Sequence, residues 1–172
     1  MKRLLLLRHA KSSRKNTALP DHDRPLTKRG EKNARRMGVY LRHEGLIPDL
    51  ALCSTAVRAV ETWKAVVGQL ERQVRTVPMP ELYTADVAGL LQTVRASSVA
   101  DDVLLLIGHN PALEELALSL AGSGEADALG KMRRKFPPGG LAVIHFDTAE
   151  WTAIAPGTGE LERFVRPKQL QS

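Results

Sequence analysis

Arg3-Leu4-Leu5-Leu6-Leu7-Arg8-His9 begins at the third residue of the chain. Its apolar run is too short for a helix and is typical of a strand that is buried on both faces of a parallel sheet. Arg8 and His9 therefore follow at the carboxyl end of this predicted strand. Ligands of open α/β sheets bind at that end, so these two side chains are candidates for chemistry.

The same pattern of a short apolar run beside an amphipathic helix recurs along the chain. Further strands are predicted over 50–53, 74–77 and 103–107. Helices are predicted to begin at Thr27, Ala56, Asp86 and Pro111, with Thr27 and Asp86 as caps. Gly45 and Gly122 mark the ends of the first and the last of these helices. This alternation predicts a mostly parallel sheet that is covered on both faces.

The last third of the chain has a different pattern. Short apolar runs over 141–146, 151–155 and 160–166 are separated by turn residues, which predicts antiparallel strands at or near an edge of the sheet. The chain has 172 residues, of which 43% are hydrophobic, so it is long enough for one sizeable core. The fold class is therefore α/β, with a single domain over residues 1–172.

Composition limits the choice of partner and compartment. Lys and Arg number 25 against 19 Asp and Glu, and the net charge of +6 favours anionic partners. The basic residues are scattered without interleaved aromatic residues, which argues against a nucleic-acid surface. The single cysteine, Cys53, excludes an internal disulfide framework. No run is long enough for a signal peptide or a membrane span, so a cytoplasmic protein is expected, with a monomer favoured.

Three groups of polar side chains are expected to meet at one edge of the sheet. Arg8 and His9 follow the first strand, Arg58 lies in the first turn of the helix after the second strand, and His109 follows the strand over 103–107. A phosphoryl group carries charge on three oxygens, and guanidinium groups match such oxygens bidentately. The pattern predicts a phosphate site in which one histidine is left to attack phosphorus.

Four motifs in the first 122 residues carry a family resemblance. In this order they resemble the motifs of the histidine phosphatase superfamily, and their wording is closer to the SixA-type phosphohistidine phosphatases than to the mutases. The glycine that commonly follows the nucleophilic histidine in the wider superfamily is replaced by alanine here. The motifs read Leu7-Arg8-His9-Ala10-Lys11-Ser12, Asp23-Arg24-Pro25-Leu26-Thr27-Lys28-Arg29-Gly30, Ser54-Thr55-Ala56-Val57-Arg58-Ala59-Val60-Glu61-Thr62 and Ile107-Gly108-His109-Asn110-Pro111.

The resemblance implies a fold, a mechanism and a set of residues. The fold would be a three-layer α/β/α arrangement of the phosphoglycerate mutase type, and the activity would need no metal and no cofactor. His9 would be the nucleophile, and Arg8, Arg58 and His109 would form the phosphate pocket. The residues implied as additional substrate contacts are Arg24, Lys11, Ser12 and Asn110.

The proton donor for the leaving group is a separate question. A phosphate ester needs a proton on its leaving oxygen, and Glu81 is the candidate acid, with Asp21 as the second choice. A phosphohistidine substrate needs less help, because its leaving imidazole has an ordinary pKa of about 6.5. Glu81 is equally well interpreted as a solvated loop carboxylate.

Several functions are compatible with these residues. A phosphohistidine protein phosphatase is the first hypothesis, and a small-metabolite phosphomonoesterase or a phosphoglycerate mutase would use the same site. A basic module that binds a phosphorylated ligand or nucleic acid is the non-enzyme alternative. The run from Cys53 to Arg58 has four intervening residues, one fewer than the cysteine-phosphatase loop. His22, His43 and His145 show no spacing typical of metal ligands. The partner is expected to be a phosphorylated protein or a small phosphorylated metabolite.

Overall fold

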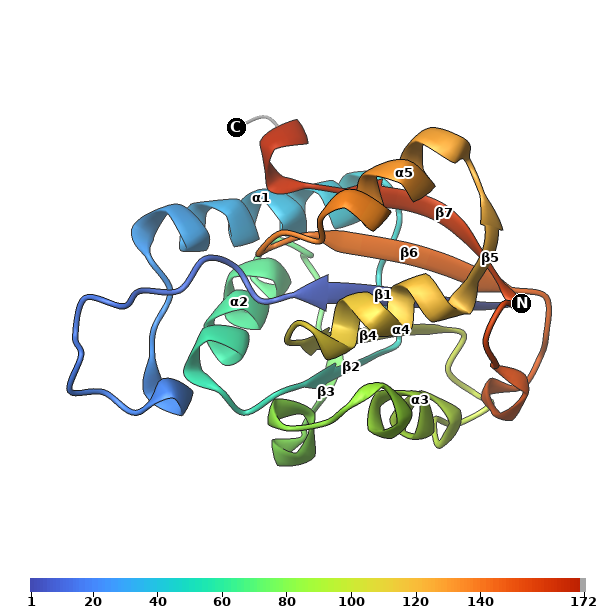
Figure 1. Ribbon diagram of the computed structural model, residues 1–172, viewed down its shortest axis with the longest axis horizontal. Coiled ribbons are helices and arrows are strands. Elements are labelled where there is room, and N and C mark those ends of the chain that lie inside the picture. The colour runs from blue at the N-terminus through green and yellow to red at the C-terminus, as the bar shows by residue number, and fades with distance from the viewer. Residues whose placement is uncertain (171–172) are drawn as a thin grey trace.

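The computed structural model describes residues 1–170, and within them a seven-stranded sheet has the order β3-β2-β4-β1-β6-β7-β5 (Figure 1). β1 lies in the middle, parallel to β4 and antiparallel to β6. The strands are β1 (Lys2–Arg8), β2 (Leu50–Cys53), β3 (Arg75–Pro78), β4 (Val103–Gly108), β5 (Ala121–Gly124), β6 (Leu141–Phe146) and β7 (Gly159–Val165).

Helices cover both faces of the sheet (Figure 1). The α-helices are α1 (Lys28–His43), α2 (Val57–Val67), α3 (Val87–Arg95), α4 (Ala112–Leu120) and α5 (Ala126–Arg134). Short 3-10 helices are η1 (Asp21–Asp23), η2 (Pro80–Tyr83), η3 (Trp151–Ala153) and η4 (Pro167–Gln169). The predicted α/β fold with a mostly parallel sheet in a three-layer arrangement is confirmed.

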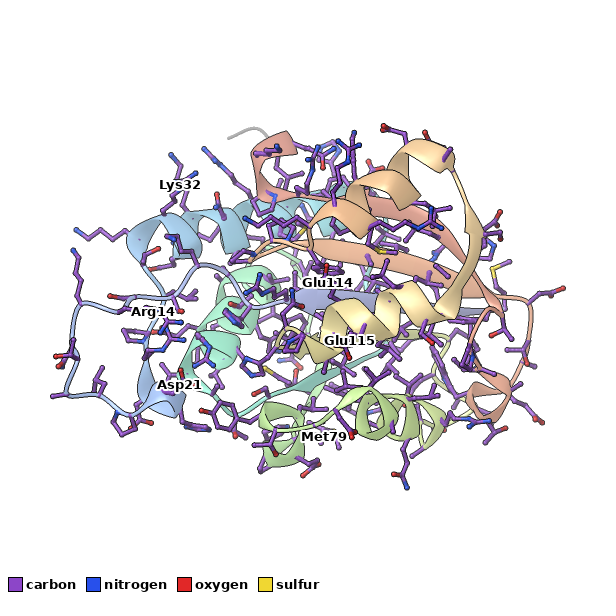
Figure 2. All side chains as sticks on the ribbon, viewed as in Figure 1. Arg14, Asp21, Lys32, Met79, Glu114 and Glu115 are labelled. Atoms are coloured by element: carbon purple, nitrogen blue, oxygen red, sulfur yellow. The ribbon has the colours of Figure 1, made fainter. Side chains whose placement is uncertain are left out.

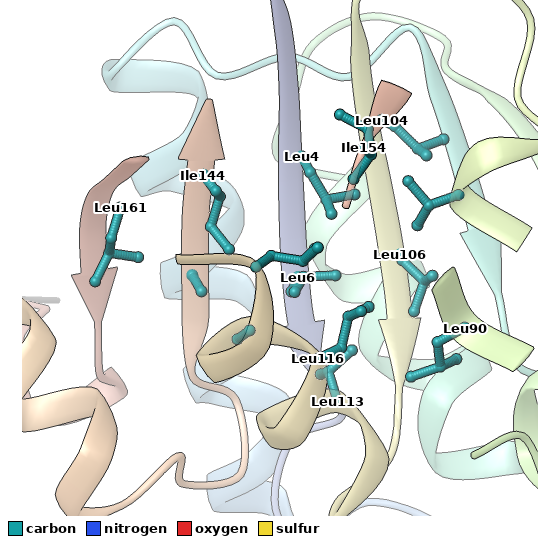
Figure 3. Close-up of a cluster of buried hydrophobic side chains, with 14 of the residues drawn as sticks. Leu4, Leu6, Leu90, Leu104, Leu106, Leu113, Leu116, Ile144, Ile154 and Leu161 are labelled. Atoms are coloured by element: carbon teal, nitrogen blue, oxygen red, sulfur yellow. The ribbon is translucent and has the colours of Figure 1, made fainter. Parts of the chain in front are cut away.

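The leucine run of β1 explains the two helical layers. Side chains alternate along a strand, so Leu4 and Leu6 point to one face and Leu5 and Leu7 to the other. All four are buried. The face of Leu4 and Leu6 packs against α3, α4 and α5, as Figure 3 shows for Leu90, Leu113 and Leu116 among others. The opposite face packs against α1 and α2. Each layer of helices therefore buries one half of the same strand.

Local signals set the helix starts that the sequence indicates. The Thr27 side chain accepts a hydrogen bond from the Gly30 amide at 2.9 Å, and Asp86 accepts one from the Gly89 amide at 2.9 Å. Both predicted caps are confirmed. Gly45 follows α1 with a φ of +68°, a conformation that costs little only for glycine.

In the last third, the predicted antiparallel strands over 141–146 and 160–166 are confirmed as β6 and β7, with β7 next to the edge strand β5. This third differs from the prediction in two places. The segment predicted as a strand over 151–155 contains η3, where Trp151 is fully buried and its indole donates to the Asp101 carbonyl at 2.7 Å. This tertiary contact outweighs the strand propensity of the segment. β5 and α5 lie in a region for which no element was predicted.

Gly30 ties the start of α1 to the loop that follows β1. A Cβ atom at Gly30 would lie 2.2 Å from the Lys11 carbonyl oxygen. We expect Gly30→Ala to lower the free energy of unfolding by about 1–3 kcal/mol, since the helix must move away from this loop. The matched control is Gly130→Ala in α5, where the nearest atom is 3.9 Å away. The control should raise stability by up to about 1 kcal/mol. Urea denaturation measures both, and equal effects would contradict the close approach.

Candidate active site

His9 lies directly after the central strand, with only 7% of its surface exposed. Its Nδ1 atom is 2.7 Å from the Ala10 carbonyl oxygen. A carbonyl only accepts, so Nδ1 carries the hydrogen and Nε2 keeps its lone pair. The backbone here is held from both sides, because the Ala10 amide donates to the Thr62 hydroxyl and the Gly139 amide donates to the His9 carbonyl. The imidazole is therefore fixed in orientation, with the lone pair on Nε2, as the predicted role of nucleophile requires.

The surroundings of His9 keep it uncharged. Burial lowers its pKa from the ordinary value of 6.5 to about 3, and the charges of His109, Arg58 and Arg8 act in the same direction. The hydrogen bond to the Ala10 carbonyl opposes this shift without reversing it. At neutral pH the ring is therefore a free base.

His109 lies beside His9, with ring centroids 5.1 Å apart. It follows β4, and its Nε2 atom is 2.7 Å from the hydroxyl of Ser54, which follows β2. The Ala56 amide donates to the same hydroxyl oxygen. When the hydroxyl donates its hydrogen to His109 Nε2, His109 Nδ1 carries the ring hydrogen. Burial, followed by the charge of Arg58, lowers the pKa of His109 to about 4.

The two arginines bring fixed positive charge to the histidine pair. Arg8 ends β1 and donates to the Phe136 carbonyl at 3.0 Å, and Arg58 lies in the first turn of α2 with 6% of its surface exposed. Burial lowers the pKa of Arg8 and Glu114 opposes this, yet a guanidinium stays charged at physiological pH. The Nε atoms of Arg8 and Arg58 and the Nδ1 atom of His109 are buried and form no hydrogen bond within residues 1–170. An oxyanion is the ligand that would satisfy such donors.

Asp21 holds Arg58 in place. It lies on η1, beyond the carboxyl end of β1 (Figure 2), and accepts hydrogen bonds from Tyr83 at 2.6 Å and from Arg58 and Arg24 at 3.0 Å each. The Tyr83 hydroxyl, and after it Arg58 and Arg24, hold the pKa of the Asp21 carboxyl well below its ordinary value. An ionised carboxylate has no proton to deliver. Asp21 therefore orients the arginines.

Tyr83 and Ser54 are site residues that the sequence interpretation did not single out. Tyr83 packs edge-on against His109 with centroids 5.5 Å apart and lies 5.8 Å from the Arg58 guanidinium. Only the run Glu81-Leu82-Tyr83 and the position of Ser54 directly after a strand were available as signals.

Glu81 lies on η2 and lines a groove that includes neither His9 nor His109. Its side chain is exposed and lines this groove, which α3 forms with β2 and β3, together with residues such as Met79 and Gln92. Tyr83 of the same short helix packs against His109. The role of Glu81 as an acid stays a prediction.

The remaining predicted contacts surround the histidine pair. Arg24 donates to the Ser12 hydroxyl at 2.8 Å as well as to Asp21. Asn110 donates to the Phe136 carbonyl at 3.1 Å and accepts from the Glu114 amide, while Lys11 is exposed and lines a neighbouring groove. The structure thus brings Arg8, His9, Arg58 and His109 together, with Arg24 and Ser12 linked to them through Asp21.

Two other kinds of site find little support. Burial raises the pKa of the Cys53 thiol to about 12, so it is not a thiolate nucleophile. Residues 1–170 contain no group of three or more His, Cys, Asp or Glu side chains placed to hold a metal ion.

None of the helices in this part of the chain is long and apolar enough to cross a membrane.

Comparison with known proteins identifies the family. A model of the histidine phosphatase superfamily (branch 1) matches residues 4–95, which is more than half of the chain. The chain belongs to this superfamily. An uncharacterized protein from Mycobacterium leprae is 34% identical over 166 residues, which cover 94% of this chain and 100% of that protein.

Solved structures of this superfamily agree with the assignment. The SixA protein from Nakamurella multipartitia, which is assigned as a phosphohistidine phosphatase, has a TM-score of 0.84 at 29% identity over 96% of each chain. A protein with the same assignment from Agrobacterium tumefaciens has a TM-score of 0.81 at 28% identity, over 96% of this chain and 98% of that one. The chain is therefore a phosphatase enzyme similar to the SixA type.

The neutral histidine pair makes stability depend on pH. Folded-state pKa values of about 3 for His9 and about 4 for His109 mean that the unfolded chain binds more protons between pH 4 and 6.5. Stability is then complete above the ordinary pKa and is lost as pH falls. We expect a loss of about 1–2 kcal/mol for each histidine between pH 6.5 and 5. Urea denaturation at both pH values should show a smaller loss in His9→Gln/His109→Gln. If the double variant lost as much stability as the wild-type protein, the lowered pKa values of His9 and His109 would be contradicted.

Proposed function

We propose that the protein hydrolyses phosphohistidine in a phosphorylated protein through a covalent phosphoryl intermediate on Nε2 of His9. The observation that carries this proposal is the 2.7 Å contact between His9 Nδ1 and the Ala10 carbonyl in a buried, neutral ring. It presents a lone pair beside donors that no group within residues 1–170 satisfies. The likeness to two proteins assigned as phosphohistidine phosphatases supports the same substrate class.

The first step transfers the phosphoryl group. The Nε2 lone pair of His9 attacks phosphorus in line with the bond to the substrate imidazole, and that bond breaks as the new one forms. The guanidinium groups of Arg8 and Arg58 and the Nδ1–H of His109 hold the phosphoryl oxygens. These donors are held before the reaction begins, so they stabilise charge with little rearrangement. Solvent supplies a proton to the other ring nitrogen of the substrate, so the ring departs as a neutral imidazole.

The second step restores the enzyme. Water attacks phosphorus, the bond to Nε2 breaks, and its electron pair returns to His9. Phosphate leaves with the oxygen of the water, and the surplus proton passes to solvent. Neither step requires a protein acid, because the leaving group is an imidazole in both steps. The substrate ring has an ordinary pKa of about 6.5, and burial lowers the pKa of His9 to about 3. This agrees with a site in which Asp21 is held ionised by Tyr83 and the arginines.

A small phosphate ester is the second candidate substrate, and the exposed carboxylate of Glu81 on η2 is the feature that favours it. An alkoxide leaving group has a pKa far above that of imidazole, so an ester requires a proton donor that the histidine pair does not supply. Movement of Glu81 toward the site would be needed for this role. A phosphoglycerate mutase would in addition have to retain its phosphoenzyme.

The covalent intermediate is the first testable consequence. Wild-type protein quenched in base after mixing with a ³²P-labelled phosphohistidine peptide should carry the label on His9. His9→Gln should carry none and lose about 10³-fold or more of the turnover, because the nucleophile is gone. His43→Gln, at an exposed histidine, is the matched control and should keep both properties. Turnover by His9→Gln, or a label on another residue, would contradict the mechanism. Loss of turnover in the presence of a chelator would contradict metal-independent catalysis.

Glu81→Gln separates the two substrate classes. We expect it to slow hydrolysis of an alkyl phosphate about 10²-fold, which is typical of a lost general acid, and to leave hydrolysis of a phosphohistidine peptide within about twofold. Glu125→Gln removes another exposed carboxylate and should affect neither substrate. Comparison of kcat/KM for the two substrates is the measurement. Equal effects on both would remove Glu81 from the role of acid.

A further inference from the structure

A cavity between α1, η4 and the segment that follows α5 has a strongly basic lining. It has a volume of about 590 Å³. α1 contributes Arg29, Lys32 and Arg36 to it, and segments distant in sequence contribute Lys11, Lys135, Arg166 and Lys168. We refer to the cavity lined by these residues as the basic groove. The side chain of Lys32 projects from the first half of α1 in Figure 2.

The charged side chains that line the basic groove within residues 1–170 are all cationic, because this lining includes no Asp and no Glu. Like charges gathered around one hollow raise the electrostatic free energy of the protein, and a bound polyanion lowers it again. Lys32, Lys135 and Lys168 are exposed, so their ammonium groups are accessible to a partner. The groove therefore favours a ligand with several negative charges.

The basic groove is joined to the catalytic end of the sheet. Lys11, two residues after His9, lines it, and so do Pro137 and Pro138. The segment that carries these prolines bonds to both Arg8 and His9, because the Phe136 carbonyl accepts from Arg8 and the Gly139 amide donates to the His9 carbonyl. A ligand in the groove thus lies against the backbone that positions the nucleophile.

The rest of the lining narrows the class of ligand. Pro137, Pro138, Pro167 and Leu170 add apolar surface between the cations. Among residues 1–170 no aromatic side chain lines the groove, so this part of the chain offers no surface on which bases would stack. A protein segment with acidic and apolar side chains can bind both the cations and the apolar residues of this lining. Nucleic acid can pair with the cations only.

We infer that the basic groove docks an acidic segment of the phosphorylated protein whose phosphohistidine is hydrolysed at His9. This inference rests on the proposed function and specifies its substrate: a phosphohistidine flanked by Asp and Glu. Charges at the rim of an interface act mainly on the rate of association, and salt screens them. The groove should therefore raise kcat/KM for an acidic phosphoprotein and leave small substrates unaffected.

Charge reversal in the basic groove tests the inference. The probes are two phosphohistidine peptides of equal length, one with Glu-rich flanks and one with Gln in their place, and phosphoramidate as a small substrate. At low salt, wild-type protein should prefer the Glu-rich peptide by about five- to twentyfold in kcat/KM. Lys32→Glu/Lys168→Glu should remove this preference and leave phosphoramidate hydrolysis unchanged.

The control has the same change in charge at another place. Lys64→Glu/Arg72→Glu reverses two exposed cations that do not line the groove, and it should keep the preference. A wild-type protein without the preference, or a preference that survives in Lys32→Glu/Lys168→Glu, would overturn the inference. Either result would leave the proposed function intact as long as both peptides are hydrolysed.

Binding without turnover separates the two proposals. Fluorescence anisotropy with the unphosphorylated Glu-rich peptide should show binding that weakens between 50 and 200 mM salt and is lost in Lys32→Glu/Lys168→Glu. This result would support the groove even if neither phosphopeptide were hydrolysed, which would contradict only the proposed function. A single-stranded oligonucleotide is the competitor. If the oligonucleotide bound more tightly than the peptide, and if Lys32→Glu/Lys168→Glu abolished its binding, the groove would be a nucleic-acid surface. The inference would then be wrong.

Discussion

The site depends on a neutral imidazole held next to two permanent positive charges. Removal from water and repulsion by Arg8 and Arg58 both disfavour the imidazolium form of His9, and burial has the larger effect. In the proposed mechanism the same guanidinium groups attract the phosphoryl oxygens. Charge would then have two roles: it adds to the effect of burial in keeping His9 unprotonated, and it binds the group that His9 attacks. The Ala10 carbonyl then decides which ring nitrogen has the lone pair.

This arrangement requires the strand order of the sheet. β1 and β4 are adjacent and parallel, and Arg8 pairs with Gly108 in their register. The residues that follow these partners are His9 and His109, so the register places the two imidazoles side by side. β2 borders β4 and ends just before Ser54, which bonds to His109. The buried leucines of β1 hold this register, because a shift by one residue would exchange the two faces of the strand.

Short-range patterns predicted most of the fold and the main site residues. The leucine run, the caps at Thr27 and Asp86 and the positions directly after strands depend on local chemistry, which a single sequence contains. The bond from Tyr83 to Asp21 joins residues 62 positions apart, and no local rule selects that pair. The 3-10 helix at the buried Trp151 could not be predicted for the same reason, because the Asp101 carbonyl that its indole bonds lies 50 positions away. The basic residues also look scattered in sequence, and only the packing of η4 near α1 gathers them into the basic groove.

The network around Asp21 connects electrostatics to the choice of leaving group. Tyr83, Arg24 and Arg58 all donate to this one carboxylate, and in doing so they hold its pKa down and fix the direction of the Arg58 guanidinium. A carboxylate in this role cannot also be a proton donor. In the proposed mechanism Asp21 thus fixes the phosphate-binding arginines and is not available as the acid that an ester would need. An imidazole leaves without such an acid, because its own pKa is low enough at neutral pH, so this geometry would limit ester hydrolysis and suffice for the proposed phosphohistidine substrate.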